Sequence, residues 1–332
     1  MSLLSLLRRT RRGVRWSALV IILMAAAGCG SEQQLTTAGT EALWLTVPQD
    51  DAQLQQVRNR ARALDVCALL PREDLAQVGE FSVRTSGPDA CEATETGTPS
   101  EGTTVKWSVA VDPVAPDTEM PYGTTKTVGA ATVWTVSDTD TRPGIEPAQL
   151  PSRGCSSTVR YPSTANFFLQ ADTQPGTDPC PIVEQLLPTA LRQWAAEPAA
   201  GTSPDTVVTA LTGQDPCAVP RTLDGAVLNA NQTLWTCGFT FRGDEILVEY
   251  KYQPVIAFVP RQAVFTVAGD PVYLYDGGDG HRTYNAVVGP VLNAEESDSS
   301  SDDLEPMVSV HGTDAAAIEE VTRRIVEELP NP

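Results

Sequence analysis

Two stretches of the chain alternate between apolar and polar residues, which is the pattern of a strand with one buried face. They are residues 105–111 and 245–252, with the sequences VKWSVAV and EILVEYKY. Their apolar faces carry Val105, Trp107, Val109, Val111, Ile246, Val248, Tyr250 and Tyr252. Because the other face of each strand is more polar, we expect both strands to lie in antiparallel sheets with one solvated side.

Three other segments repeat apolar residues at the three- and four-residue spacing of a helix. The first covers residues 50–64, the second contains Pro188, which is expected to kink it, and the third starts at Thr313 or Asp314 as its N-cap. The apolar stripes of these helices contain Leu54, Val57, Ala61, Leu64, Ile182, Leu186, Leu191, Trp194, Ile318, Val321, Ile325 and Leu329.

The same order of motifs occurs twice. DVCALLPR at 65–72 recurs as DPCAVPR at 215–221, and TVGAATVWTV at 127–136 recurs as TVAGDPVYLY at 266–275. Each copy then closes with an apolar strand, a polar turn and an amphipathic helix. The two copies are joined near EPAAGTSP at 197–204, where Pro, Gly and Ala indicate a linker. We interpret the chain as a tandem duplication.

The fold expected from these patterns is α+β: two tandem disulfide-stapled domains, each a mainly antiparallel sheet packed by an N-terminal and a C-terminal helix. The 332 residues suit two domains preceded by a targeting segment. The predicted boundaries are 1–28 for a signal peptide, 29–48 for a tether, 49–197 for the first repeat, 198–204 for the linker and 205–332 for the second repeat.

The N-terminal segment has the layout of a secretory signal. Five arginines precede a short apolar run at 18–27, and small residues then lead to Cys29. The run is too short for a comfortable transmembrane helix, which needs about 20 apolar residues. AAGC at 26–29 resembles a lipobox, although Ala26 replaces the usual Leu, so Cys29 is the predicted site of lipid attachment. The alternative is an ordinary secreted protein cut near Ala27.

Six further cysteines remain, and an even number in an exported chain indicates disulfides. The repeat pairs Cys67 with Cys91 and Cys217 with Cys237, because each copy has a second cysteine a short way downstream of the first. Cys155 and Cys180 are then left to each other. A metal site is the alternative, but the chain has no CxxC pair and no cluster of histidines, so we expect no metal.

The charge excludes one class of partner. Removal of residues 1–28 takes away five arginines and no acidic residue, which leaves 18 basic against 42 acidic groups and a net charge of −24. Such a chain is repelled by nucleic acid and by anionic lipid headgroups. We therefore expect no nucleic-acid partner, and we expect the acyl chain on Cys29 to provide the membrane contact.

A family resemblance follows from these features. The lipobox, an acidic residue with PCA before a short helix, a second cysteine before a strand, and the closing strand and helix resemble actinobacterial cell-surface lipoproteins of a domain-of-unknown-function family. The layout is more distantly similar to extracellular sensor domains of mycobacterial receptor serine/threonine kinases. The resemblance covers 65–196 and 213–329, in tandem copies instead of the usual single one. It implies a stapled α+β domain with a groove for an unidentified partner or ligand, and it supplies no catalytic residues.

The residues that bear catalytic chemistry are few. His281 lies in a glycine-rich connection and His311 at the end of a predicted strand, so a loop position and strand-edge packing are expected for them. The common hydrolase and nucleotide-binding motifs are absent from the sequence. Asp276 and Asp279 are oxygen ligands of the kind that calcium takes, but hairpin-turn chemistry explains the same residues, and we favour a hairpin turn.

Two loops and several tryptophans complete the picture. Residues 92–104 and the acidic, serine-rich stretch 295–305 are expected to be solvated loops. Trp44 stands in the polar tether region, where it either packs on the first domain or serves as an exposed anchor. The tryptophans expected in the core are Trp107, Trp134, Trp194 and Trp235.

These observations predict an extracytoplasmic lipoprotein, anchored to the cell membrane through lipidated Cys29, that acts as a non-catalytic binding or sensing module. Its ligand is expected at the cleft between the two domains, and is a protein, a cell-wall component or a small molecule. We expect no cofactor and no enzyme activity. Two alternatives stay open: a cell-wall hydrolase with two facing carboxylates, and a lipid carrier with an apolar cavity between sheet and helices.

Overall fold

The computed structural model describes residues 43–97, 102–112, 122–258, 262–278, 280–292 and 303–330. Cys29, most of the tether, Asp279 and most of the 295–305 loop therefore lie outside the described residues. Within the described part, no helix is both long enough and apolar enough to cross a membrane. Residues 37–332 form one compact unit, which contains the two domains described below.

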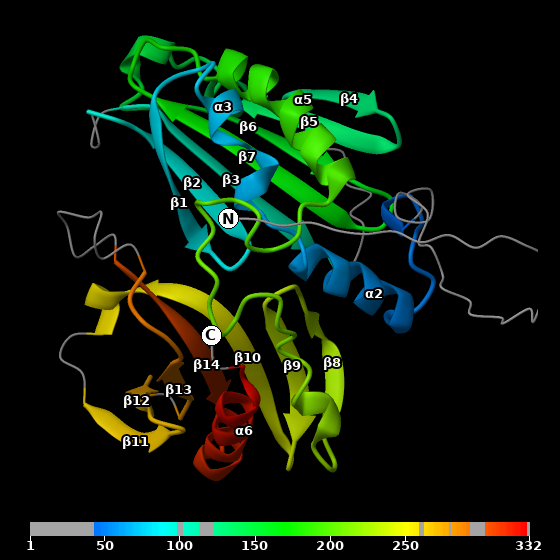
Figure 1. Ribbon diagram of the computed structural model, residues 1–332, viewed down its shortest axis with the longest axis vertical. Coiled ribbons are helices and arrows are strands. Elements are labelled where there is room, and N and C mark those ends of the chain that lie inside the picture. The colour runs from blue at the N-terminus through cyan, green and yellow to red at the C-terminus, as the bar shows by residue number, and fades with distance from the viewer. Residues whose placement is uncertain are drawn as a thin grey trace, which may run out of the picture. The chain divides into compact units, whose positions relative to one another are not determined.

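The first domain is built on a seven-stranded antiparallel sheet (Figure 1). Its strand order is β1-β2-β3-β7-β6-β5-β4, so the long hairpin β4–β5 forms one edge and β1 the other. The strands are β1 (Phe81–Gly87), β2 (Ala90–Glu95), β3 (Thr104–Val111), β4 (Thr124–Val128), β5 (Ala131–Ser137), β6 (Arg153–Arg160) and β7 (Ala165–Thr173).

The second domain repeats this topology. Its order is β11-β12-β13-β14-β10-β9-β8, which matches the first sheet strand for strand when it is read from β8. The strands are β8 (Val227–Gln232), β9 (Thr236–Phe241), β10 (Asp244–Pro254), β11 (Ala263–Val267), β12 (Asp270–Asp276), β13 (Arg282–Val287) and β14 (Leu304–Gly312). The repeated sequences TVGAATVWTV and TVAGDPVYLY form the equivalent edge hairpins β4–β5 and β11–β12.

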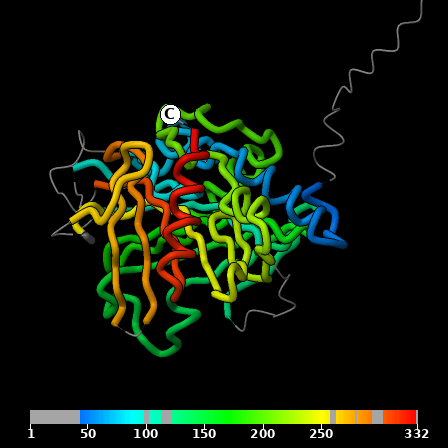
Figure 2. Tube along the Cα trace, turned by 90° about the horizontal axis from the view of Figure 1, so that it is seen from below, coloured from blue at the N-terminus to red at the C-terminus, as the bar shows by residue number. Residues whose placement is uncertain are grey.

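Each sheet has a closing helix on its buried face. In the first domain α5 (Cys180–Ala196) packs on β6 and β7, and in the second domain α6 (Ala315–Glu328) packs on β13 and β14. Figures 1 and 2 both show α6 lying across the second sheet. The short elements are α3 (Arg72–Leu75), α4 (Asp138–Thr141), η1 (Cys67–Leu69), η2 (Pro147–Gln149), η3 (Pro220–Thr222) and η4 (Val255–Phe258).

The N-terminal helices of the two copies differ. The first domain has α2 (Asp51–Arg62), which packs on β3 and β7. At the equivalent place before the second sheet, residues 205–226 form turns and the 3-10 helix η3, with no α-helix. Among the described residues, an N-terminal α-helix, expected in both copies, is therefore present in the first copy alone.

The alternation seen in the sequence places the core. In β3, Val105, Trp107, Val109 and Val111 are all buried, and the residues between them are more exposed. Trp107, Trp194 and Trp235 are buried as expected. The core prediction for Trp134 is wrong: Ala131 and Val133 are the buried residues of β5, and Trp134 lies on the opposite, partly exposed face. The Arg160 guanidinium lies over the Trp134 ring, 4.8 Å from the ring centroid.

Three disulfides staple the two domains. They join Cys67 to Cys91, Cys155 to Cys180 and Cys217 to Cys237. The repeat predicts the first and third of these pairs, and the second is the pair that then remains. The first and third are equivalent, since each links the residue before the sheet to the second strand. The bond from Cys155 to Cys180 is special to the first domain and ties β6 to the start of α5.

Candidate functional site

The acidic residue of the first DVCALLPR motif, Asp65, holds the segment that leads into the second domain. Its side chain is buried, and it accepts hydrogen bonds from the backbone of Ser203 at 2.8 Å, from the Thr206 hydroxyl at 2.5 Å and from the backbone of Ala68 at 3.1 Å. Its own backbone N–H donates to the Pro198 carbonyl at 2.7 Å. The predicted linker at 198–204 is therefore bound to the first domain.

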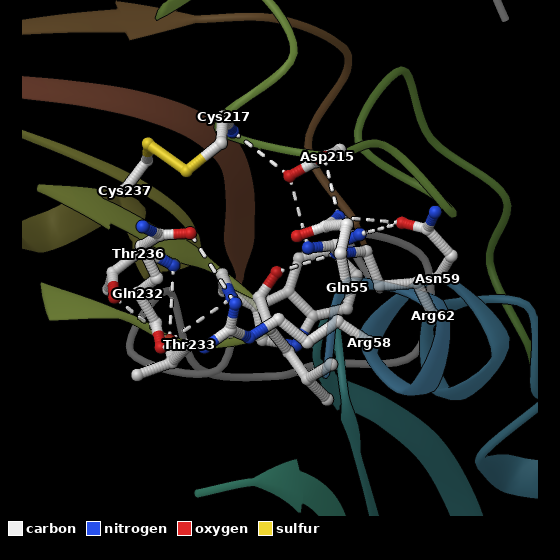
Figure 3. A network of polar contacts seen from close by, with 12 residues as sticks. Gln55, Arg58, Asn59, Arg62, Asp215, Cys217, Gln232, Thr233, Thr236 and Cys237 are labelled. Carbon is white, nitrogen blue, oxygen red and sulfur yellow. Dashed lines mark hydrogen bonds and ion pairs between the residues drawn. A yellow bond between two sulfur atoms is a disulfide. The ribbon is translucent and has the colours of Figure 1, made fainter. Parts of the chain in front are cut away.

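The equivalent residue of the second motif, Asp215, holds α2 of the first domain. Its carboxylate accepts from Arg62 at 3.0 Å and from Gln55 at 2.9 Å, both on α2 (Figure 3). It also accepts from the backbone of Cys217 at 3.0 Å and pairs with Arg221 of its own motif. The two copies of the motif therefore have the same role, since each carboxylate accepts hydrogen bonds from residues on the other side of the domain boundary.

Helix α2 has a second buried stripe that the apolar pattern did not reveal. Val57 and Ala61 face the first sheet, while Arg58 and Arg62, one position further along, are each 4% exposed. Arg62 donates to the Leu234 carbonyl at 2.9 Å and to Asn59 at 2.8 Å, in addition to Asp215. Burial lowers the pKa of Arg62 to about 10, and Asp215 opposes that shift. The side chain is still protonated at neutral pH.

A groove of about 590 Å³ opens beside this contact. One wall is α2, which contributes Asp51, Gln55 and Arg58, together with Ala52 and Leu54. The other wall belongs to the second domain, with Arg221 from η3 and polar and apolar residues of β8. The residues from β8 are Leu228, Asn229, Ala230 and Gln232. The groove therefore exists only where the two copies meet.

Arg58 is the unusual residue of this groove. Its guanidinium donates to the Gln232 carbonyl at 2.9 Å and, weakly, to the Gln232 side chain at 3.4 Å, as Figure 3 shows. In the part of the chain that the structure describes, its Nε has no acceptor, and no carboxylate forms an ion pair with it. Burial lowers the pKa of Arg58, and Asp215 and Asp51 act in the opposite direction from a distance. A buried cation without a paired anion is costly, so the groove favours an anionic group.

The other singled-out residues lie elsewhere. Trp44 packs on the first domain: it is 3% exposed, its ring is 5.0 Å from that of Trp194, and its Nε1 donates to Glu197 at 2.6 Å. His311 is the second-last residue of β14 and shares a hydrogen bond of 2.8 Å with the Thr283 hydroxyl. Asp276 accepts from the backbone of Gly278 at 3.0 Å in the β12–β13 turn.

His281 lies in a turn and in no ligand cluster of the described part of the chain. The backbone carbonyl of His281 accepts from Gly277, which closes the same turn between β12 and β13. Among the described residues, no group of three or more His, Cys, Asp or Glu side chains is arranged to hold a metal ion.

The sequence did contain a signal for the residues that were missed. Asp51, Gln55, Arg58 and Arg62 follow one another at helical spacing, beside the apolar stripe of the same helix. A polar stripe of this kind is normally a solvated face. Only the position of the second domain makes it a buried contact and one wall of a groove.

No family model matches the sequence, and no curated protein matches it. Among solved structures, the chain is similar to DynU16, described as a protein in the dynemicin biosynthetic locus, with 12% identity over 81% of this chain and 90% of that chain and a TM-score of 0.15. A TM-score this low carries no argument about fold or function.

Proposed function

We propose that the protein is a membrane-anchored extracytoplasmic lipoprotein that binds or senses a ligand without catalysis, and that the groove between α2 and β8 is its ligand site. The observation that carries this proposal is the groove itself, whose walls come from both copies and include the buried, unpaired guanidinium of Arg58. Sites at the junction of two domains, with a few convergent polar groups, are where ligands commonly bind.

Three disulfides support the export part of the proposal, because such bonds persist in oxidising compartments. The signal-like segment and the lipobox-like AAGC at 26–29 support an anchor at Cys29. A single acyl chain gives reversible membrane binding, and diacylglycerol, with two chains, holds a protein much more firmly.

The composition of the groove supports binding over hydrolysis. Its described lining consists of guanidinium, amide and apolar groups with one carboxylate, that of Asp51. Glycoside hydrolysis normally needs two facing carboxyl groups, and this lining contains no second one among the residues described. Polar side chains of this kind orient a ligand by hydrogen bonds.

A matched pair of variants tests the site. Ala52→Trp puts an indole into the groove from the second position of α2, and Ala316→Trp puts one at the second position of α6, outside the groove. Both alanines are exposed. The chain from Gly30 onward, purified from its host, is weighed by native mass spectrometry and again after denaturation.

We expect the native mass to exceed the denatured mass for the wild-type chain and for Ala316→Trp, and the two masses to agree for Ala52→Trp. A co-purified molecule that persists in Ala52→Trp would place the ligand elsewhere. Equal masses in the wild-type chain would argue against a resident small ligand.

A second variant tests the lipid anchor. In the full-length protein, Cys29→Ser should move the chain from the detergent phase to the aqueous phase of a phase-separation experiment. If the variant still partitions with the membrane, the lipid anchor is refuted.

A further inference from the structure

We propose that the groove binds a short peptide with free termini, whose carboxylate is held between Arg58 and Arg221 and whose amino group faces Asp51. This inference rests on the proposed function, since it names the ligand class of the same groove. Three features of the groove's lining support it: the two guanidinium groups of Arg58 and Arg221, which interact electrostatically, the single carboxylate of Asp51, and amide and apolar side chains in the remaining positions.

The anionic end of the ligand follows from Arg58. Its side chain has lost nearly all contact with solvent, and among the described residues only Gln232 accepts hydrogen bonds from it. The 3.4 Å contact with the Gln232 amide is long for a hydrogen bond. A carboxylate that displaced this amide would gain a charge-assisted bond and would provide the counter-ion that Arg58 lacks.

Arg221 supplies the second cation. It pairs with Asp215, its side chain is 35% exposed, and it lines the same groove as Arg58. The two guanidinium groups repel each other, which contributes to the lowered pKa of Arg58. An anion bound between them would relieve that repulsion, and two donors in fork geometry suit a planar carboxylate.

The charge of the chain favours a carboxylate over a phosphate. Asp51 lines the groove and Asp215 lies next to Arg221, and the mature chain would carry a net charge of −24. A dianion would be repelled by this surrounding field, whereas a monoanion that also carries a cation is neutral overall. A zwitterion is therefore the better match.

The spacing along α2 sets the length of the ligand. Asp51 and Arg58 are seven residues apart, so they lie on the same face of the helix about 10 Å from each other along its axis. Three residues of extended peptide span about 10 Å. Leu54 and Gln55 lie between the two charges on α2, and Asn229 stands on the opposite wall, where its amide can meet the peptide backbone.

The probe is trialanine, titrated calorimetrically into the chain from Gly30 onward, beside N-acetyl-trialanine and trialanine amide. We expect the amide and the acetylated peptide each to bind about tenfold or more weakly than trialanine, because each loses one charge-assisted contact. The Asp51→Asn variant should bind the acetylated peptide as tightly as trialanine, and should still bind the amide more weakly. The penalty for acetylation or amidation is the loss of affinity relative to trialanine. In Arg221→Gln the amidation penalty should shrink and the acetylation penalty should remain.

Arg58→Gln should remove the amidation penalty as well, and its thermal unfolding is recorded to confirm that the chain folds. Arg221→Gln replaces a more exposed side chain, so the test does not depend on Arg58→Gln folding. Arg324→Gln, which removes an exposed cation from α6, is the control and should bind all three peptides as the wild-type chain does.

The outcomes separate this inference from the proposed function. If trialanine does not bind, or binds no better than its acetylated and amidated forms, the peptide assignment is overturned. If the wild-type chain nevertheless co-purifies with another molecule that Ala52→Trp excludes, the groove is still the ligand site. If neither Asp51→Asn nor Arg221→Gln changes the loss of affinity caused by acetylation or amidation, the peptide binds outside the groove.

Discussion

Asp89 is a further ionisable residue at the contact between the two domains. It lies in the turn between β1 and β2, where its backbone carbonyl accepts from Val109 at 3.0 Å. Burial raises the pKa of its carboxyl to about 6, and the backbone N–H of Asp89 itself and the Trp235 indole of the second domain oppose that rise. The folded chain therefore holds a carboxylate at neutral pH at some cost.

This shift predicts a pH dependence of stability. A carboxyl whose pKa is higher in the folded than in the unfolded chain contributes stability below its unfolded value near 3.8, and that contribution is lost as the pH rises through about 6. Urea unfolding at pH 4.5 and pH 8 measures it. Asp89→Asn should be more stable than the wild-type chain at pH 8, and its advantage should shrink or reverse at pH 4.5.

Glu73→Gln is the control, because Glu73 is exposed in the first turn of α3. Its free energy of unfolding relative to the wild-type chain should change little between the two pH values. If Asp89→Asn shows the same difference from the wild-type chain at both pH values, Asp89 does not carry the proposed proton linkage.

The helices show how local sequence fixes where an element begins. Asp314 is the N-cap of α6, and its carboxylate accepts from the backbone N–H groups of Ala316 at 2.9 Å and Ala317 at 3.3 Å. Asp244, at the start of β10, holds the cap residue in place, because it accepts hydrogen bonds from the backbone of Thr313 and Asp314, both at 2.8 Å. The sequence allowed either Thr313 or Asp314 as the cap, and the structure selects Asp314.

Asp314→Ala should lower the free energy of unfolding by about 1 kcal/mol, because two helical N–H groups lose their acceptor. Chemical denaturation at neutral pH measures the change. Glu327→Ala alters an exposed position near the end of the same helix, and should change the free energy by less than about 0.5 kcal/mol. Equal losses in the two variants would mean that the cap does not stabilise α6.

Elements with a clear period were predictable from the sequence, and the contact between domains was not. The alternation in residues 105–111 and 245–252 gave β3 and β10 their buried faces, and the repeat gave the disulfide pairs. Trp134 was misplaced because the face of a tryptophan in a strand is set by its neighbours, and Val133 takes the core position. Arg58 and Arg62 were missed because a polar stripe does not reveal which surface will cover it.

At the scale of the whole molecule, the two copies share one sheet topology, and two different hydrogen-bond networks join them. The Asp65 network, made with Ser203, Thr206 and Ala68, fastens the connection to the first domain. The Asp215 network, made with Gln55 and Arg62, fastens α2 to the second domain. Both carboxylates occupy the same position of the repeated motif, so each copy of the motif contributes one carboxylate to the contact between the domains.

These two networks should make the domains unfold together. Replacing both carboxylates, in Asp65→Asn with Asp215→Asn, puts amide N–H groups against existing donors and leaves buried groups unsatisfied, at about 1–3 kcal/mol each. The sheets, the closing helices and the disulfides of both domains are untouched. By differential scanning calorimetry we expect one transition for the wild-type chain and two for the double variant.

Asp138→Asn provides the matched control, because Asp138 is as richly bonded as Asp65 but within one domain. Its carboxylate accepts from Arg153 at 2.8 Å and from the backbone of Gly154 at 3.0 Å. Its loss should lower the melting temperature while the chain keeps a single transition, since the contact between the domains is intact. If the double variant also melts in one transition, with calorimetric and van't Hoff enthalpies that agree, other contacts must couple the domains. Arg72 with Asp205, whose side chains bond at 2.9 and 3.0 Å, would then be the next pair to remove.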